Sequence, residues 1–279
     1  MLARVGVHGV LAAADTRSAL AILQQDGVVS FASTTRIRAQ ALQWQTEGIA
    51  LFEDYLGRAK RLPQPLGIGK EQGYRELVQK DEGRFDVSLD HTLSGASDKH
   101  VVDHVRAYVM DRISPVLITL FGVDYLTNAQ GLVISMPGTK EQSWHVDSSH
   151  LFRSKPDMVL PAHFVTCFVP LYEGAPEIGL TEFALGSFRH TGLLGVDTVE
   201  QQYPDEEETG RLLGLTTQAT MQCNHGEIYV MDGRTLHRGL ANISTQTRPL
   251  VYMSFCPPWY REWPRSQDDT HSLFEHKPI

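Results

Sequence analysis

The segment Gln142-Ser-Trp-His-Val-Asp147 contains the residue types of a metal site. If this segment is a β-strand, His145 and Asp147 point to the same face, because side chains alternate across a strand. One imidazole and one carboxylate on one face make two-thirds of the facial triad that holds non-haem Fe(II). A lone His-x-Asp/Glu pair carries little weight, since 12 histidines and 33 acidic residues in 279 produce about 1.4 chance matches.

The chain contains two such pairs, and their surroundings separate them. A triad needs a second histidine on a distant strand, and His237 lies several predicted strands beyond Asp147. The rival pair is His225 and Glu227, but His237 follows Glu227 by only ten residues, and the intervening glycine favours a turn. We therefore interpret the rival pair as structural and take His145, Asp147 and His237 as the candidate metal ligands and catalytic centre.

A cation suited to a carboxylate follows the second histidine. Arg248 lies eleven residues after His237 and opens the apolar segment 250–256. A guanidinium group pairs with a carboxylate through two parallel hydrogen bonds, which a lysine cannot do. Arg248 is thus the candidate for holding the distal carboxylate of a co-substrate.

The first half of the chain, which must support this site, has a helical pattern. Apolar spacing predicts helices over 16–25 and 37–62, and a further helical stretch over 98–121. Pro115 indicates a kink or a break in the last of these. A short strand is expected over 28–31. Residues 67–97 are mixed in composition, and we expect loops with one strand.

From Leu132 onward the pattern changes to short β-rich segments punctuated by Gly, Pro and Asp. Many short strands in succession indicate a jelly roll. The acidic stretch 197–210 is interpreted as a solvated loop. The expected strands cover residues 132–136, 143–147, 163–171, 180–185, 216–223, 227–231 and 250–256.

Four segments together resemble the phytanoyl-CoA dioxygenase-like branch of the Fe(II)/2-oxoglutarate oxygenases, nearest to its small-molecule-modifying members. The first is the strand start Gln24-Gln-Asp-Gly-Val-Val29, and the second is the metal strand 142–147. The third is the turn Gly179-Leu-Thr-Glu-Phe-Ala-Leu-Gly-Ser187. The fourth is the final block Gly226-Glu-Ile-Tyr-Val-Met-Asp-Gly-Arg-Thr-Leu-His-Arg-Gly-Leu-Ala-Asn-Ile-Ser244. Their order and spacing agree with the family over most of the chain.

The resemblance implies a role for each matching residue. His145, Asp147 and His237 would ligate Fe(II), and Arg248 would bind the distal carboxylate of 2-oxoglutarate. Fungal members that modify small molecules have a glutamine near the C1 carboxylate of 2-oxoglutarate. Gln142 resembles that glutamine in its position, three residues before His145. Thr181 is a further candidate for a contact with the co-substrate.

Two departures from the family pattern concern the turn. Leu185-Gly-Ser-Phe188 stands where Pro-Gly-Ser-His is common, and Leu180 replaces the usual proline. The missing histidine is not an iron ligand in the family, so only local turn structure is affected. Asp147 is present, whereas halogenating relatives lack this carboxylate, which argues against halogenation.

The implied fold is α+β and mainly β: a double-stranded β-helix, or jelly-roll and cupin-like barrel, with a helical N-terminal layer. We expect a single domain over 1–279, with mainly helical support over 1–125, the jelly-roll core over 126–262 and a C-terminal tail over 263–279. The implied activity is that of a 2-oxoglutarate-dependent dioxygenase using Fe(II), 2-oxoglutarate and O2. It would oxidise a C–H bond of a small, largely apolar metabolite, by hydroxylation, desaturation or oxidative rearrangement, releasing succinate and CO2.

Composition bounds the partners. The formal net charge of −8 argues against a nucleic-acid or anionic-membrane partner, which would require a basic face. The three cysteines, Cys167, Cys223 and Cys256, form no CxxC pair, so we expect free thiols and a cytoplasmic location. The oligomeric state stays open, a homodimer included. The alternative function is a jelly-roll protein that binds a metal or ligand without oxygenase turnover.

Overall fold

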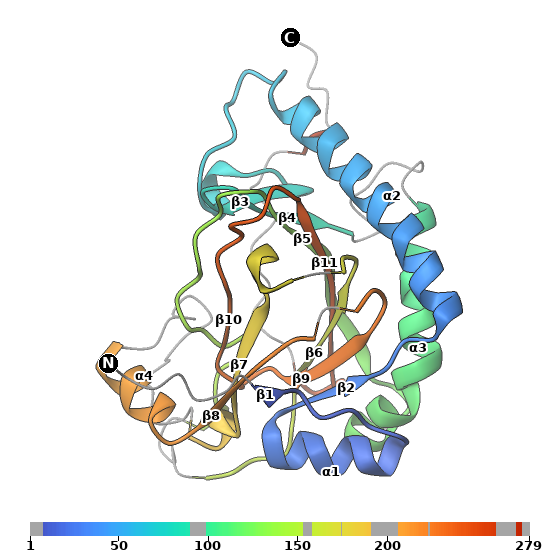
Figure 1. Cartoon of the computed structure of the whole chain (residues 1–279), viewed down its shortest axis with the longest axis vertical. Helices are drawn as coiled ribbons and strands as arrows, with labels where there is room; N and C mark the ends of the chain where they lie inside the picture. Colours follow the sequence, from blue (N-terminus) through green and yellow to red (C-terminus); the bar gives the residue numbers. More distant parts are fainter. Residues whose placement is uncertain are drawn as a thin grey trace.

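The short β-rich segments form two facing sheets in the computed structural model of the chain (Figure 1). The structure describes residues 8–89, 99–152, 158–173, 175–190, 206–222, 224–260 and 272–274. The larger sheet has seven strands in the order β2-β9-β6-β11-β5-β4-β3, and the smaller has four in the order β1-β8-β7-β10. Their core is the expected jelly roll, and the fold is mainly β with helices on one side.

Strands from the second half of the sequence contribute to both sheets. The larger sheet comprises β2 (Val28–Phe31), β3 (Leu77–Asp81), β4 (Arg84–Ser88), β5 (Leu126–Ser135), β6 (Val165–Pro170), β9 (Ile228–Asp232) and β11 (Arg248–Cys256). The smaller comprises β1 (His8–Gly9), β7 (Thr181–Leu185), β8 (Thr217–Thr220) and β10 (His237–Gly239).

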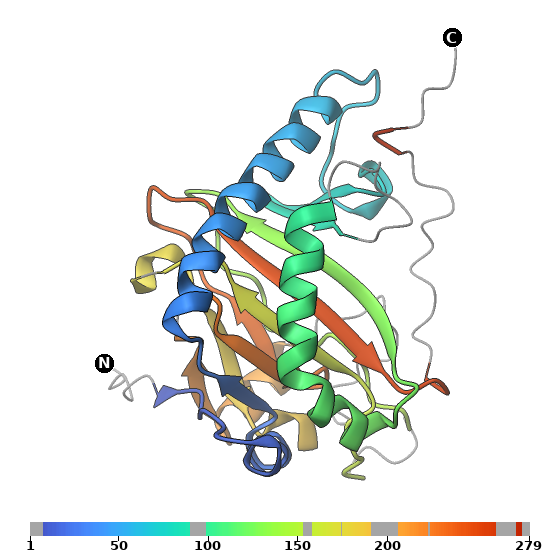
Figure 2. The same ribbon diagram turned by 90° about the vertical axis from the view of Figure 1, so that its right-hand side faces the viewer.

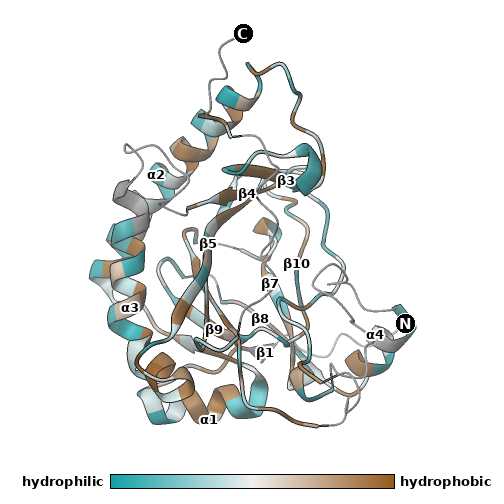
Figure 3. Cartoon of the chain, turned by 180° about the vertical axis from the view of Figure 1, so that it is seen from behind, coloured by the Kyte–Doolittle hydropathy of each residue, from teal (hydrophilic) through white to brown (hydrophobic). Residues whose placement is uncertain are grey.

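Two long helices cover the outer face of the larger sheet, as Figure 2 shows. They are α2 (Thr35–Ala59) and α3 (Lys99–Phe121), and α1 (Thr16–Asp26) lies at one end beside β2. Apolar and polar residues alternate along them (Figure 3), and their apolar residues pack on the sheet. The core between helices and sheet includes Trp44, Phe52, Val109, Leu132 and Met253.

Strand β11 is buried on both faces. Val251, Met253 and Phe255 belong to the core under the helices, whereas the alternate positions Leu250 and Tyr252 face the space between the sheets. Because side chains alternate along a strand, one strand contributes to two different environments. This explains the nearly continuous apolar run that the sequence shows here.

Several predictions from the sequence are corrected by the structure. Residues 143–147 are not a regular strand, since only His145 makes a bridge, to His237. The segment 67–97 contains two strands, β3 and β4, in place of one. A break at Pro115 is absent, because α3 continues through it while its buried face packs against the sheet. Because proline has no backbone N–H, it removes a single hydrogen bond from the helix.

The acidic stretch predicted as a loop is helical at its end. Helix α4 spans Glu206–Leu213, with Leu212 buried against Val146 and Leu236. Residues 197–205 of that stretch lie outside the described residues, as do residues 90–98 and most of the C-terminal tail. Cys167 and Cys256 are buried thiols outside any disulfide, as expected, and Cys223 lies outside the described part. Within the described helices, none has the length and apolar character needed to cross a bilayer.

Gly27 ends α1 in the left-handed region, with a φ of 79°. Its carbonyl accepts hydrogen bonds from the Asp232 amide at 2.8 Å and the Thr235 hydroxyl at 3.1 Å. A Cβ here would collide with the Thr235 hydroxyl and lie 2.7 Å from the Phe188 ring. The glycine therefore connects α1 closely to the block that carries His237.

We expect Gly27→Ala to lower the free energy of unfolding by about 1–3 kcal/mol, from backbone strain and this collision. Urea denaturation followed by circular dichroism measures the change. Gly57→Ala in α2 is the matched control, because its Cβ meets only the Arg61 guanidinium at 3.8 Å. That variant should be stabilised by about 0.5–1 kcal/mol. Equal stability of the two variants would contradict the strain argument.

Candidate functional site

The segment carrying the His-x-Asp pair lies antiparallel beside residues 233–239. The amides of His145 and His237 each donate to the other's carbonyl at 3.0 Å, and Gln142 donates to Gly239 at 2.8 Å. At the other end, the amides of Asp147 and Ser148 both donate to the Gly233 carbonyl. Two amides sharing one acceptor interrupt the ladder, which explains why the segment is extended without being a regular strand.

This pairing brings the three predicted ligands together. The rings of His145 and His237 lie 4.3 Å apart between centroids, and His237 Nε2 lies 3.6 Å from Asp147 Oδ1. The nearest ligand atoms of the three residues all fall within 4.8 Å of one another. Two imidazoles and one carboxylate on one side of a cavity are the donor set that non-haem Fe(II) takes.

Both histidines are held by the same local contact. His145 Nδ1 lies 3.0 Å from the Ser143 carbonyl, and His237 Nδ1 lies 3.1 Å from the Thr235 carbonyl. A carbonyl only accepts hydrogen bonds, so in each ring Nδ1 carries the hydrogen. Each Nε2 is then left with a lone pair, the form that binds a metal.

Electrostatics favours a neutral imidazole at His145. Burial, followed by the nearby His237, lowers the pKa of His145 to about 3. A neutral ring does not have to lose a proton before it binds a metal. Phe168 and Phe183 pack against His237, with ring centroids 6.0 and 6.3 Å away, and limit its rotation.

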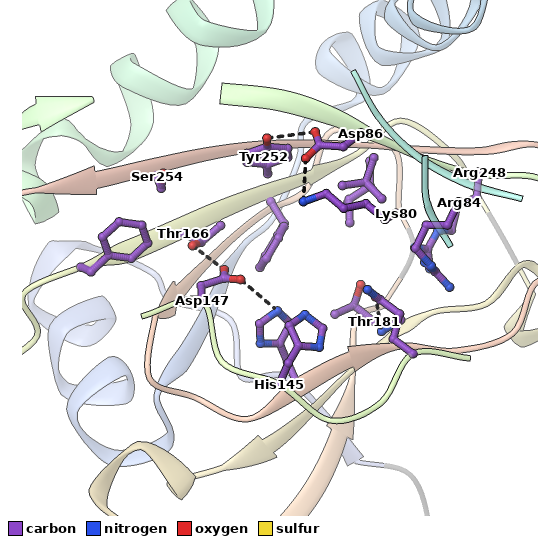
Figure 4. A pocket seen from close by; sticks show the side chains of 17 residues that line it. Lys80, Arg84, Asp86, His145, Asp147, Thr166, Thr181, Arg248, Tyr252 and Ser254 are labelled. Atoms are coloured by element: carbon purple, nitrogen blue, oxygen red, sulfur yellow. Dashed lines mark hydrogen bonds and ion pairs between the residues drawn. The ribbon is translucent and has the colours of Figure 1, made fainter. Parts of the chain in front are cut away.

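Thr166 fixes the carboxylate. Its hydroxyl donates to Asp147 Oδ2 at 2.7 Å, which leaves Oδ1 directed toward His237 (Figure 4). The sequence analysis did not single out this residue. A threonine on a buried strand is common, so its role becomes apparent only from the pairing of the elements.

At another part of the same cavity, polar groups converge around Gly239. A Cβ on this residue would lie 2.7 Å from Gln142 Oε1, 2.8 Å from Arg84 Nη1 and 3.4 Å from Arg248 Nη2. The predicted residues Gln142 and Arg248 are therefore neighbours, and the cavity also includes Thr181, which is buried. The structure adds Arg84, a second guanidinium that the sequence analysis missed.

Both arginines are almost completely buried. Arg84 donates to the Ser135 hydroxyl at 2.8 Å and to the Lys140 carbonyl at 2.9 Å. Arg248 donates from Nη1 to the Gly179 carbonyl, and its Nε has no hydrogen-bond partner in the part of the chain that the structure describes. A buried guanidinium with an unsatisfied donor is costly, so Arg248 fits a site that receives an anion.

The rival pair lies elsewhere. His225 is directed toward Gln45, with Nε2 3.3 Å from its Oε1, and Glu227 accepts a hydrogen bond from Tyr229 at 2.8 Å. Neither residue lines the cavity of the triad. Context, rather than the His-x-acid pattern, separates the two pairs.

The family model "Phytanoyl-CoA dioxygenase (PhyH)" matches residues 23–250. The chain belongs to the phytanoyl-CoA dioxygenase family. It is therefore a 2-oxoglutarate-dependent dioxygenase, for which iron and 2-oxoglutarate are the cofactors. "Dioxygenase hkm4" from Aspergillus hancockii is 24% identical over 230 residues, which cover 77% of this chain and 69% of that protein.

Solved structures with the same fold are more distant in sequence. EctD from S. alaskensis, solved with 2-oxoglutarate and 5-hydroxyectoine, has a TM-score of 0.59 at 18% identity, covering 90% of this chain and 80% of EctD. AviO1 from Streptomyces viridochromogenes Tue57 has a TM-score of 0.58 at 15% identity, covering 89% of this chain and 98% of AviO1. The epimerase SnoN from nogalamycin biosynthesis has a TM-score of 0.56 at 15% identity, covering 95% of this chain and 92% of SnoN.

The contact to Asp147 generates a prediction. We expect Thr166→Val to weaken Fe(II) binding about 10-fold, because contacts that orient a metal ligand are typically worth 10- to 100-fold in affinity. Anaerobic titration with Fe(II) measures this. Thr166→Ser restores a hydroxyl and should recover most of the affinity. Wild-type affinity in the valine variant would show that this hydrogen bond does not orient the carboxylate.

Proposed function

We propose that His145, Asp147 and His237 bind Fe(II) as a facial triad. The support is their convergence within the cavity and the shared orientation of the two imidazoles, each with Nδ1 against a backbone carbonyl. These three residues would hold the ion, and the ion would supply the oxidative chemistry of a non-haem iron centre.

We further propose that Arg248 binds the distal carboxylate of 2-oxoglutarate, with Gln142 and Thr181 as further contacts and Arg84 as a second cation. The co-substrate is a dianion, and these groups form the cationic part of the cavity, next to the triad. Its keto-acid end then faces His145 and His237. The guanidinium of Arg248 sits rigidly, because it donates to the Gly179 carbonyl and lies 5.9 Å from the Tyr172 ring centroid.

The proposed reaction is oxidation of a C–H bond in a small, largely apolar metabolite. When bound, iron and 2-oxoglutarate supply the oxidising chemistry with O2 and release succinate and CO2. The chain's own residues hold these groups, orient the substrate and exclude water. Val133, Phe164, Phe168 and Leu250 form the apolar wall beside the triad, which suits a substrate with an apolar body.

The outcome of the oxidation is hydroxylation, desaturation or an oxidative rearrangement. SnoN is described as an epimerase and SnoK as a carbocyclase, both dependent on α-ketoglutarate. One jelly-roll scaffold is thus used by proteins with different outcomes, since the position of the substrate's hydrogens depends on the cavity wall.

The observation that carries the proposal is that the triad lines the same cavity as Arg84 and Arg248. Its test is anaerobic addition of Fe(II) and 2-oxoglutarate, which should produce the weak visible charge-transfer band of the bound keto acid. His237→Ala should abolish the band, whereas His225→Ala should retain it. Succinate release with a panel of small molecules then separates an oxygenase from a jelly-roll protein that binds without turnover. A band unaffected by His237→Ala would refute the ligand assignment.

Arg248→Lys tests the co-substrate site. Lysine keeps the charge but loses the paired hydrogen bonds, so we expect 2-oxoglutarate to bind about 10- to 100-fold more weakly, from about 1.5–3 kcal/mol of charge-assisted bonding. Fe(II) affinity should hardly change. The dissociation constant from the charge-transfer band provides the measurement.

Arg238→Lys is the matched control for this substitution. Arg238 also lies on a strand of the jelly roll, but it pairs with Glu182 at 2.8 Å and stacks over Trp144, outside the cavity. Its variant should bind 2-oxoglutarate normally. An unchanged affinity in Arg248→Lys would remove Arg248 from the co-substrate site.

A further inference from the structure

A second polar cluster lines the cavity on the wall across from the triad (Figure 4). It consists of Lys80 on β3, Asp86 on β4 and Tyr252 on β11, and is called the Lys80 cluster below. The Tyr252 hydroxyl donates to Asp86 Oδ1 at 3.0 Å, and Lys80 Nζ lies 3.2 Å from Asp86 Oδ2. Neither the triad nor the proposed co-substrate contacts use these three residues.

The backbone between these strands is shaped to hold the tyrosine. Gly131 on β5 lies directly opposite Tyr252, and a Cβ there would lie 2.5 Å from the phenol oxygen. The ring therefore crosses the glycine and reaches the neighbouring strand β4. A glycine inside a strand often marks such a close approach, and here it lets the hydroxyl meet Asp86.

The hydrogen bonds within the cluster leave capacity on the lysine. Each oxygen of Asp86 already faces one partner, and its side chain is only 14% exposed. Lys80 is 35% exposed and borders the cavity. An ammonium has three N–H donors, so its contact with Asp86 does not exhaust them. Lys80 therefore brings hydrogen-bond donors to a molecule in the cavity, whereas the less exposed carboxylate of Asp86 faces Lys80 and Tyr252.

The formal charges of the residues that line the cavity also limit the kind of substrate. Lys80 and Asp86 cancel, and Arg84 and Arg248 outweigh Asp147 by one positive charge. A divalent cation and a dianionic co-substrate cancel each other, so the loaded cavity keeps one positive charge. A cationic substrate would meet like charge in a poorly solvated site, which is costly. A neutral or anionic molecule is favoured.

We propose that Lys80 binds a carbonyl or carboxylate oxygen of the substrate, and that Asp86 and Tyr252 are positioning residues that orient the lysine. The substrate is then a molecule with an apolar body and an oxygen acceptor at the end remote from the oxidised C–H bond. The apolar wall formed by Val133, Phe168 and Leu250 takes the body. This inference rests on the proposed function, since it concerns the substrate of the same site.

The test uses matched sets of arenes that differ in one substituent. Naphthalene-2-carboxylate, naphthalene-2-carboxamide and 2-methylnaphthalene are one such set. Their dissociation constants are measured anaerobically by titration calorimetry on protein loaded with Fe(II) and saturating 2-oxoglutarate. We expect the two oxygen-bearing members to bind about 10-fold more tightly than the methyl member, as for one hydrogen bond to a charged group.

The variants assign that preference to the cluster. Lys80→Met should abolish it and leave the affinity for the methyl member unchanged. Asp86→Asn and Tyr252→Phe should reduce it, again without weakening the methyl member, whereas a collapse of the wall would weaken all members alike. Lys60→Met, at the exposed end of α2, is the control for loss of one lysine charge and should bind like wild type.

The outcomes that overturn the inference are distinct. Absence of the acceptor preference in the wild type, including no detectable binding of any member, contradicts it. An acceptor preference that persists in Lys80→Met also contradicts the inference. Loss of the 2-oxoglutarate charge-transfer band in Lys80→Met would place the lysine in the co-substrate site instead. Absence of that band in the wild type would refute the proposed function, and this inference with it.

Discussion

The antiparallel pairing of residues 142–148 with residues 233–239 is the constraint on which the site depends. It is the contact that places His145 opposite His237, although the two are far apart in the chain. A metal site requires ligand positions that are accurate to a fraction of an ångström, and mutual backbone hydrogen bonds provide that accuracy. The same Nδ1-to-carbonyl contact, to the residue two before, then orients each ring.

Two strands of the larger sheet, β4 and β11, lie on either side of β5, and each contributes side chains to two regions of the cavity. On β4, Arg84 lies at the cationic end of the cavity, and Asp86, two residues later, belongs to the Lys80 cluster. On β11, Arg248 lies at the cationic end, and Tyr252, four residues later, belongs to the Lys80 cluster. Since the side-chain period of a strand is two, both pairs reach the same cavity at different depths. The spacing between the proposed co-substrate groups and the proposed substrate groups is thus set by the rise along the strands.

So many buried charges on one sheet face are unfavourable for stability. The opposite face compensates, because α2 and α3 cover it with a continuous apolar core that includes Val251, Met253 and Phe255. A strand such as β11 therefore serves two purposes at alternate positions. The N-terminal helices contribute no side chain that lines the described cavity, yet they stabilise the sheet whose other face carries the polar groups.

The sequence by itself determined the chemical types at the centre, which are the His-x-Asp pair, the later histidine and the arginine eleven residues beyond. It also determined the β-rich order that indicates a jelly roll. Only the tertiary structure decided that Arg84, Thr166 and the Lys80 cluster meet these residues, that residues 143–147 are extended without forming a regular strand, and that α4 covers part of a stretch taken for a loop. The reason is physical. Alternation shows which residues share a face, but it does not show which face meets the cavity, because that depends on hydrogen bonds between β4, β5 and β11, which are distant in the chain.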